Sequence, residues 1–149
     1  MKRHLLIFVM LLGAVSSWGQ TAPDMAAVLQ KIITLPELQG YLPSSNGDTQ
    51  VQTVVMQYPV SFPDEVVNVI DPSIVAFRSL EAIQTGGVQA YFTFRSVKLT
   101  PSGATANFNL FYDYDTGSST YKILIVDIQL QHFNTNWSVS NLNIGGVTR

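Results

Sequence analysis

The sequence predicts an α+β domain in which an N-terminal helix packs on a strongly bent antiparallel β-sheet meander. The first observation is an apolar stripe at three- and four-residue spacing over 24–33, which is typical of a helix with one buried face. The second is the alternation of apolar and polar residues over 104–110 and 124–130, which indicates strands with one face in water. The third is a series of turn sequences between 100 and 136 that would join neighbouring strands as hairpins.

Residues 1–19 have the features of a Sec-type export signal. Lys2 and Arg3 give it a positively charged start, and the apolar run over 5–14 is too short to cross a bilayer as a helix. Small residues at its end fit a cleavage site, which leaves 20–149 as one domain. We therefore expect an exported protein, periplasmic or secreted, with no transmembrane segment after cleavage.

Composition indicates a single domain and excludes several classes of site and partner. About 130 residues remain after the signal, enough for a single core, with a helical start over 24–39 and a β-rich remainder over 51–146. The chain has no cysteine, which excludes disulfides and thiolate metal sites. Ten acidic and eight basic residues give a net charge of −2, which becomes −4 when the two basic residues of the signal are removed. The remaining basic residues are scattered, so a nucleic acid partner is not expected.

Two helices are predicted before the strands. The apolar stripe marks a helix over 24–33, and Asp24 can cap its first turn. Thr34 and Glu37 match a capping box, which predicts a short second helix over 35–39.

Segments with strand preference follow. Residues 51–58 and 66–70 are rich in valine and read as two strands. Residues 74–84 are ambiguous, because their apolar residues repeat at helical spacing although the first four would also suit a strand. The remaining strands are predicted over 88–99, 104–114, 121–133 and 137–144.

Alternation within these strands predicts which side chains face the core. From Ala104 to Tyr114 the even-numbered residues, Tyr112 included, are expected on one face, with Phe111 as an apolar exception on the other. In the next strand the expected inner-face residues are Leu124, Val126, Ile128 and Leu130.

A leading helix, long antiparallel strands, the stretch 137–140 (Trp-Ser-Val-Ser) and the pair Gly145-Gly146 together resemble the cystatin-like and NTF2-like superfold. The chain is similar in particular to small, uncharacterised exported proteins of Gram-negative bacteria. The resemblance covers about residues 24–146 and implies a helix packed on a sheet. Because this superfold supports many functions, the resemblance implies none in particular.

Two motifs near position 115 suggest chemistry that the rest of the sequence does not support. Residues 115–119 (Asp-Thr-Gly-Ser-Ser) match the sequence around the catalytic carboxylate of pepsin-like aspartic proteases, but that chemistry needs two such aspartates and a second Asp-Thr-Gly is absent. Asp113 and Asp115 could begin a calcium loop, but Ser118 and Leu124 stand where that loop needs glycine and glutamate. We predict a polar hairpin turn.

Two titratable residues, His132 and Asp127, are candidate catalytic groups. His132 is the one histidine beyond the signal, which excludes a metal site built from several histidines of one chain. Its position near a strand end predicts an exposed side chain. Asp127 lies in an apolar strand, where burial would raise its pKa, but Gln129 and Gln131 share its face and predict that it meets solvent. We therefore predict no catalytic residues, no metal site and no cofactor.

Aromatic residues gather on the neighbouring strands and allow two interpretations. They can form cross-strand pairs that fill a core without disulfides. They can instead expose a platform that stacks a sugar or docks another protein. Tyr91, Phe111 and Tyr121, which interrupt or end polar faces, are the candidate contacts for such a platform.

The favoured function is an exported, non-catalytic binding or accessory domain with a protein or envelope component as its partner. The alternative is a small-ligand-binding or enzymatic domain whose pocket, between helix and sheet, is lined by Tyr58, Asp127 and Trp137. A third hypothesis is self-association through an unpaired apolar strand such as 121–130.

Overall fold

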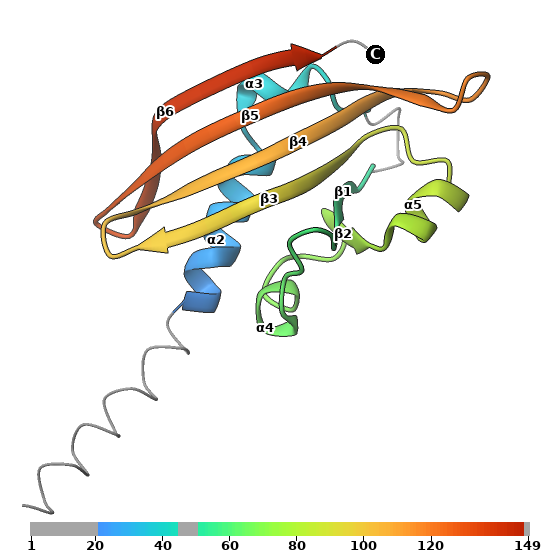
Figure 1. Cartoon of the computed structure of the whole chain (residues 1–149). Helices are drawn as coiled ribbons and strands as arrows, with labels where there is room; N and C mark the ends of the chain where they lie inside the picture. Colours follow the sequence, from blue (N-terminus) through green and yellow to red (C-terminus); the bar gives the residue numbers. More distant parts are fainter. Residues whose placement is uncertain (1–20, 45–50, 148–149) are drawn as a thin grey trace, which may run out of the picture.

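The computed structural model describes residues 21–44 and 51–147, and the expected export signal lies outside these ranges (Figure 1). The described chain is α+β, as predicted, with one open six-stranded sheet. Within these ranges no helix combines the length and apolarity needed to cross a membrane. The helices are α2 (Thr21–Ile33), α3 (Pro36–Gln39), α4 (Asp64–Val67) and α5 (Leu80–Thr85). The strands are β1 (Thr53–Met56), β2 (Val75–Arg78), β3 (Tyr91–Thr100), β4 (Gly103–Asp115), β5 (Thr120–Phe133) and β6 (Asn136–Val147).

The sheet is mixed, which corrects the prediction of a purely antiparallel one. The strand order is β2-β1-β3-β4-β5-β6. Strands β3 to β6 form the predicted antiparallel meander. However, β1 runs parallel to both β2 and β3. The chain passes through α4 after β1 and through α5 after β2, and such crossovers return it in the same direction.

The start of α2 and the junction between α2 and α3 differ from the prediction. Helix α2 begins at Thr21, so Asp24 lies within its first turn. The Thr34 hydroxyl donates a hydrogen bond to the carbonyl oxygen of Gln30 at 2.6 Å, which closes the end of α2. Leu35 precedes α3 and makes no capping bond with its side chain. Both predicted helices are present, but the predicted capping box is wrong.

The predicted strand over 66–70 is also wrong, because α4 occupies its start. Pro63 stands immediately before this helix, where its fixed φ is compatible with a helical turn. Val66 and Ile70 are buried, whereas Val69 is 58% exposed. This is the burial pattern of one helical turn against a core, and packing of that turn outweighs the modest strand preference of valine.

The ambiguous segment 74–84 contains both predicted alternatives. Its first half forms β2 and its second half forms most of α5. Ser79 separates the two, because its hydroxyl oxygen accepts a hydrogen bond from the backbone N–H of Ala82 at 3.2 Å. This is an N-cap, which starts a helix directly after a strand.

The main core lies between α2 and the inner face of the meander, where α2 crosses behind the long curved strands (Figure 1). The inner-face residues predicted for β5 are all buried, as expected. Each large apolar side chain buried here stabilises the fold by about 1.5–3 kcal/mol. The largest fully buried side chains of this core include Leu29, Ile32, Phe92, Phe94 and Phe108.

A β-bulge in β4 sends Tyr114 to the face opposite Tyr112. Asp113 has a left-handed φ of 51°, and the register with β5 shifts just after Tyr112. Tyr112 packs on Tyr41, with ring centroids 4.9 Å apart, whereas Tyr114 stacks on Tyr121 at 4.6 Å. The prediction that Tyr112 and Tyr114 share a face is wrong, because the extra residue shifts the alternation by one.

Candidate functional site

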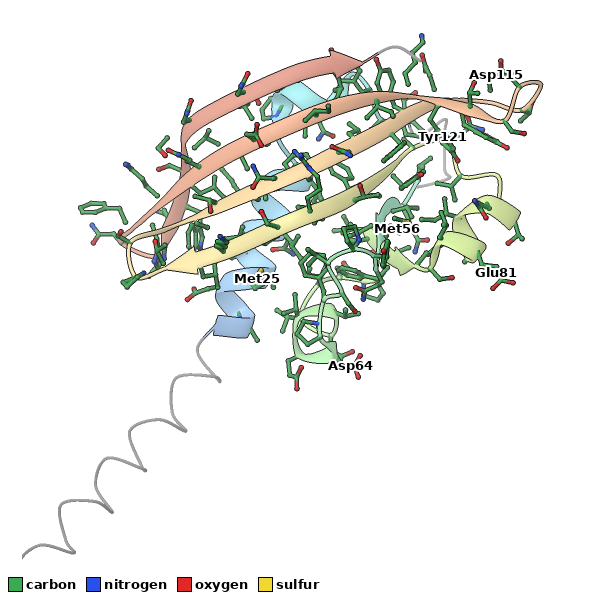
Figure 2. The ribbon with its side chains drawn as sticks, viewed as in Figure 1. Met25, Met56, Asp64, Glu81, Asp115 and Tyr121 are labelled. Carbon is green, nitrogen blue, oxygen red and sulfur yellow. The ribbon has the colours of Figure 1, made fainter. Side chains whose placement is uncertain are left out.

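An apolar cleft of about 690 Å³ opens between the first half of α2, the segment leading into α4, and β3. In Figure 2, Met25 lies on α2 and Asp64 lies on α4, below the sheet. The three walls come from parts of the chain that are far apart in sequence. The lining residues are Ala22, Pro23, Met25, Val60, Ser61, Phe62, Pro63, Glu65, Val66, Val69 and Val97.

The wall formed by the segment before α4 is held by hydrogen bonds to its backbone. The Gln57 side chain accepts a hydrogen bond from the N–H of Phe62 at 2.6 Å and donates one to its carbonyl oxygen at 3.2 Å. The N–H of Val60 donates to the carbonyl oxygen of Phe94 on β3 at 3.3 Å. These bonds hold the wall in place without a ligand, which lowers the entropy cost of binding.

The Phe62 side chain joins the cleft to the main core. Its ring meets that of Phe94 edge-on, with centroids 5.4 Å apart, and lies 5.9 Å from the ring of Phe77. Phe62 is itself buried. The floor of the cleft is therefore continuous with the packed interior.

The cleft has few polar side chains, and the charged one is acidic. Of its lining residues, Glu65 is the one that carries charge and Ser61 the one with a hydroxyl group. The Glu65 carboxylate in the lining disfavours an anionic ligand and favours a neutral or cationic one.

The residues expected to line a pocket do not meet in one. Tyr58 is 69% exposed and does not line the cleft. Asp127 lies on the outer face of the sheet, away from α2. Trp137 contacts the main core beside Lys31 of α2 and stacks on His132, with ring centroids 4.5 Å apart. A cleft between helix and sheet is present, but other residues form it.

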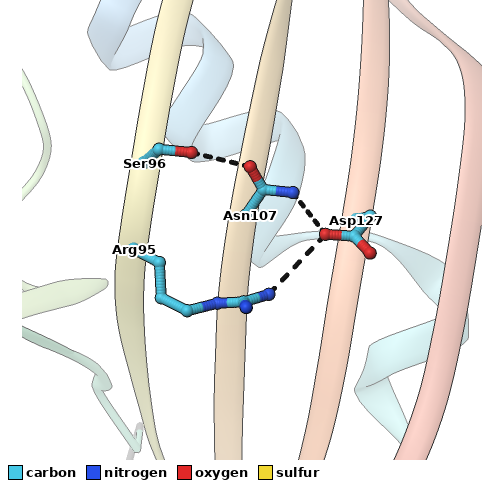
Figure 3. Close-up of polar contacts among 4 residues, drawn as sticks. All are labelled: Arg95, Ser96, Asn107 and Asp127. Carbon is cyan, nitrogen blue, oxygen red and sulfur yellow. Dashed lines mark hydrogen bonds and ion pairs between the residues drawn. The ribbon is translucent and has the colours of Figure 1, made fainter.

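Asp127 belongs to a row of polar side chains across the outer face (Figure 3). Its carboxylate accepts a hydrogen bond from the Asn107 amide and lies 3.6 Å from the Arg95 guanidinium. The Ser96 hydroxyl donates to Asn107 at 2.6 Å. About half of the Asp127 side chain is exposed, as the alternation predicted. An exposed pair of this kind stabilises a fold by at most about 1 kcal/mol.

The three candidate platform residues form one cluster on the outer face, at the end of the sheet near α5. Tyr91 stacks on Phe111 at 4.8 Å and meets Tyr121 edge-on at 5.2 Å. The Tyr121 hydroxyl donates to the carbonyl oxygen of Val88 at 2.8 Å. Tyr91 is only 7% exposed and packs with Ile83 of α5. This geometry is that of cross-strand core pairing.

Burial of this cluster gives a testable pH dependence. Loss of solvent, and secondarily the nearby Tyr121, raises the pKa of Tyr91 from 10.0 to about 12. An unfolded chain therefore loses this proton at lower pH than the folded one, so the stability contribution is complete below about pH 10 and disappears as pH rises through 12. We expect Tyr91→Phe to reduce the alkaline fall in melting temperature while unfolding close to the wild type at pH 8. A variant that keeps the full alkaline fall would contradict this assignment.

The turn between β4 and β5 has the polar geometry that its sequence predicts. The Asp115 carboxylate accepts hydrogen bonds from the Ser118 hydroxyl at 2.8 Å and the Gly117 N–H at 2.9 Å, which lower its pKa. Asp113 instead pairs with Lys122 at 2.8 Å and raises the pKa of that amine. Across residues 21–44 and 51–147, no three His, Cys, Asp or Glu side chains are grouped closely enough to hold a metal ion.

Comparisons with protein-family models, curated proteins and solved structures gave no significant match to this chain.

Proposed function

We propose that this chain is an exported, non-catalytic binding domain whose cleft between α2 and α4 holds the apolar part of an envelope component. The observation that carries the proposal is the cleft itself. Its volume of about 690 Å³ lies within the range of about 300–1,000 Å³ that small-ligand sites occupy. Its lining is mostly hydrocarbon, contributed by α2, α4 and β3. Such a lining can bind a ligand by burying apolar surface.

Glu65 narrows the class of ligand that the cleft can hold. It is the charged residue of the lining, so the headgroup of an amphiphilic ligand would lie near its carboxylate. A carboxylate or phosphate held there would be repelled, whereas an uncharged or cationic group would be accepted. We therefore propose a neutral or cationic amphiphile with a short hydrocarbon chain or ring.

Two observations support the proposal that this domain is exported and that it has a fold known to hold binding sites of many kinds. The signal features of residues 1–19 support export, which would bring the domain into contact with envelope molecules. The packing of α2 on the antiparallel meander of β3 to β6 is compatible with the resemblance to the cystatin-like and NTF2-like superfold, which implies a helix packed on a sheet. The cleft lies where α2 meets the segment leading into α4.

Ligand titration of the processed protein tests this proposal. The chain is expressed from Met1 in an exporting Gram-negative host, and intact mass is expected to show that the purified product begins at Gln20. The probe is N-phenyl-1-naphthylamine, a neutral apolar fluorophore, and we expect saturable binding at one site. Val69→Asp should weaken this binding about tenfold or more, because it replaces apolar lining with a carboxylate.

Val51 provides a matched control for this experiment. It is 42% exposed, comparable with Val69, and lies outside the cleft lining. Val51→Asp should bind the fluorophore with unchanged affinity, and both variants should keep the far-ultraviolet circular dichroism of the wild type. No saturable binding, or equal weakening by the two substitutions, would overturn the proposed site.

A further inference from the structure

Strand β6 is a long free edge that carries no charge. It pairs with β5 on one side, and among the described residues no strand pairs with its other side. None of the residues in Asn136–Val147 is charged, and none is proline. Exposed edges are usually protected from pairing by charges, prolines or short length. The opposite edge has such protection, because β2 is only four residues long and ends at Arg78.

We propose that β6 pairs antiparallel with β6 of a second copy of this chain, around a two-fold axis at Asn143. The pairing would continue the sheet from one copy into the next. The register shift opposite Gln129 and Leu130 breaks the regular ladder near Ser140, so the regular part of the strand begins at Asn141. Centring the two-fold axis on Asn143 uses this regular part.

The side chains that meet in this register are complementary on both faces. Asn143 faces its own copy and Asn141 faces Gly145, on the polar outer face. On the inner face Leu142 faces Ile144, and both side chains are half-buried against the main core. The pairing would cover their remaining exposed surface and satisfy the free backbone groups of the edge.

Charge favours this edge over other surfaces for contact between two copies. Two copies of the processed protein, each with a net charge of −4, repel one another overall. Strand β6 brings no charged side chain to the contact. The apolar strand 121–130, which the sequence suggested as a self-association segment, lies within β5 and is paired on both sides. The edge available for self-association is therefore β6.

Analytical ultracentrifugation of the processed protein over a wide concentration range tests the pairing. The wild type is expected to dimerise. Asn143→Lys should weaken dimerisation at least tenfold at low salt, because it sets two ammonium groups opposite one another at the axis. Within one copy the new lysine faces Asp127 of β5, so it does not set like charges opposite one another there. Asn136→Lys makes the same change at the start of β6, outside the proposed register, and should leave the dimer intact. A wild type that stays monomeric, or equal weakening by both variants, would overturn the proposal.

Cross-linking locates the axis independently. Because the natural chain has no cysteine, a single introduced thiol reports one position only. Directly opposed residues of antiparallel strands lie about 4.5–5.5 Å apart at their Cα atoms, which suits a disulfide. Asn143→Cys should form a covalent dimer on mild oxidation, and Asn136→Cys should stay monomeric. Equal cross-linking of both variants would show random collision and contradict the register.

Discussion

Phe94→Ala is expected to lower the free energy of unfolding by about 3–5 kcal/mol, as measured by chemical denaturation. The Phe94 side chain is fully buried on the inner face of β3. Its ring centroid lies 5.3 Å from that of Phe108 and 5.4 Å from that of Phe62. Truncation would leave a cavity between the sheet and the wall of the cleft, and neither neighbour could fill it without losing its own contacts.

Phe133→Ala is the matched control for this prediction. Phe133 is 75% exposed at the end of β5, so the same truncation should change the unfolding free energy by less than about 0.5 kcal/mol. If Phe94→Ala does not fold, Phe94→Leu provides the measurement, with an expected loss of about 1–2 kcal/mol. Equal losses at positions 94 and 133 would contradict the described core.

Gly103→Ala is expected to destabilise the fold by about 1–3 kcal/mol. A Cβ at this position would overlap the carbonyl oxygen of Leu130 on the neighbouring strand β5. The obstacle is backbone, so β4 or β5 must move to relieve the overlap. Gly103 is thus needed for close approach between strands, although the sequence alone indicates only a turn glycine. Denaturation of the variant and the wild type under the same conditions measures the loss.

Gly40→Ala controls for the substitution itself. Among the described residues, apart from the two chain neighbours of Gly40, no atom would lie within 4 Å of the new Cβ, and Gly40 has a φ of −67°, which alanine adopts freely. We expect a change within about 0.5 kcal/mol, in either direction. A loss at Gly40 as large as that at Gly103 would show that the close contact with Leu130 is not the cause.

The sequence predicts the parts of this fold that depend on local pattern. Alternation between Leu124 and Leu130 places the inner face of β5 correctly, and the turn sequences give the hairpins of the meander. The position of β1 beside β3 depends on pairing between Val54 and Tyr91, which are far apart in the chain and share no local signal. The alternation of apolar and polar residues also does not predict the bulge at Asp113, because a bulge interrupts that alternation.

Local sequence pattern does not predict the cleft, for a related reason. Its walls come from α2, the segment before α4, and Val97 of β3, which only the tertiary fold brings together. One local signal was available. Val60 and Phe62 are apolar residues in a proline-bounded segment that forms neither helix nor strand, and such residues need a tertiary partner.

Methionine methyl NMR during titration with N-phenyl-1-naphthylamine shows whether a ligand enters the cleft. Beyond the expected signal the chain has two methionines, Met25 in the cleft lining and Met56 in the cluster on the other face of the sheet. We expect the Met25 methyl resonance to shift in a saturable manner while that of Met56 stays in place. Saturation without a shift at Met25, or a shift at Met56 instead, would contradict the proposed site.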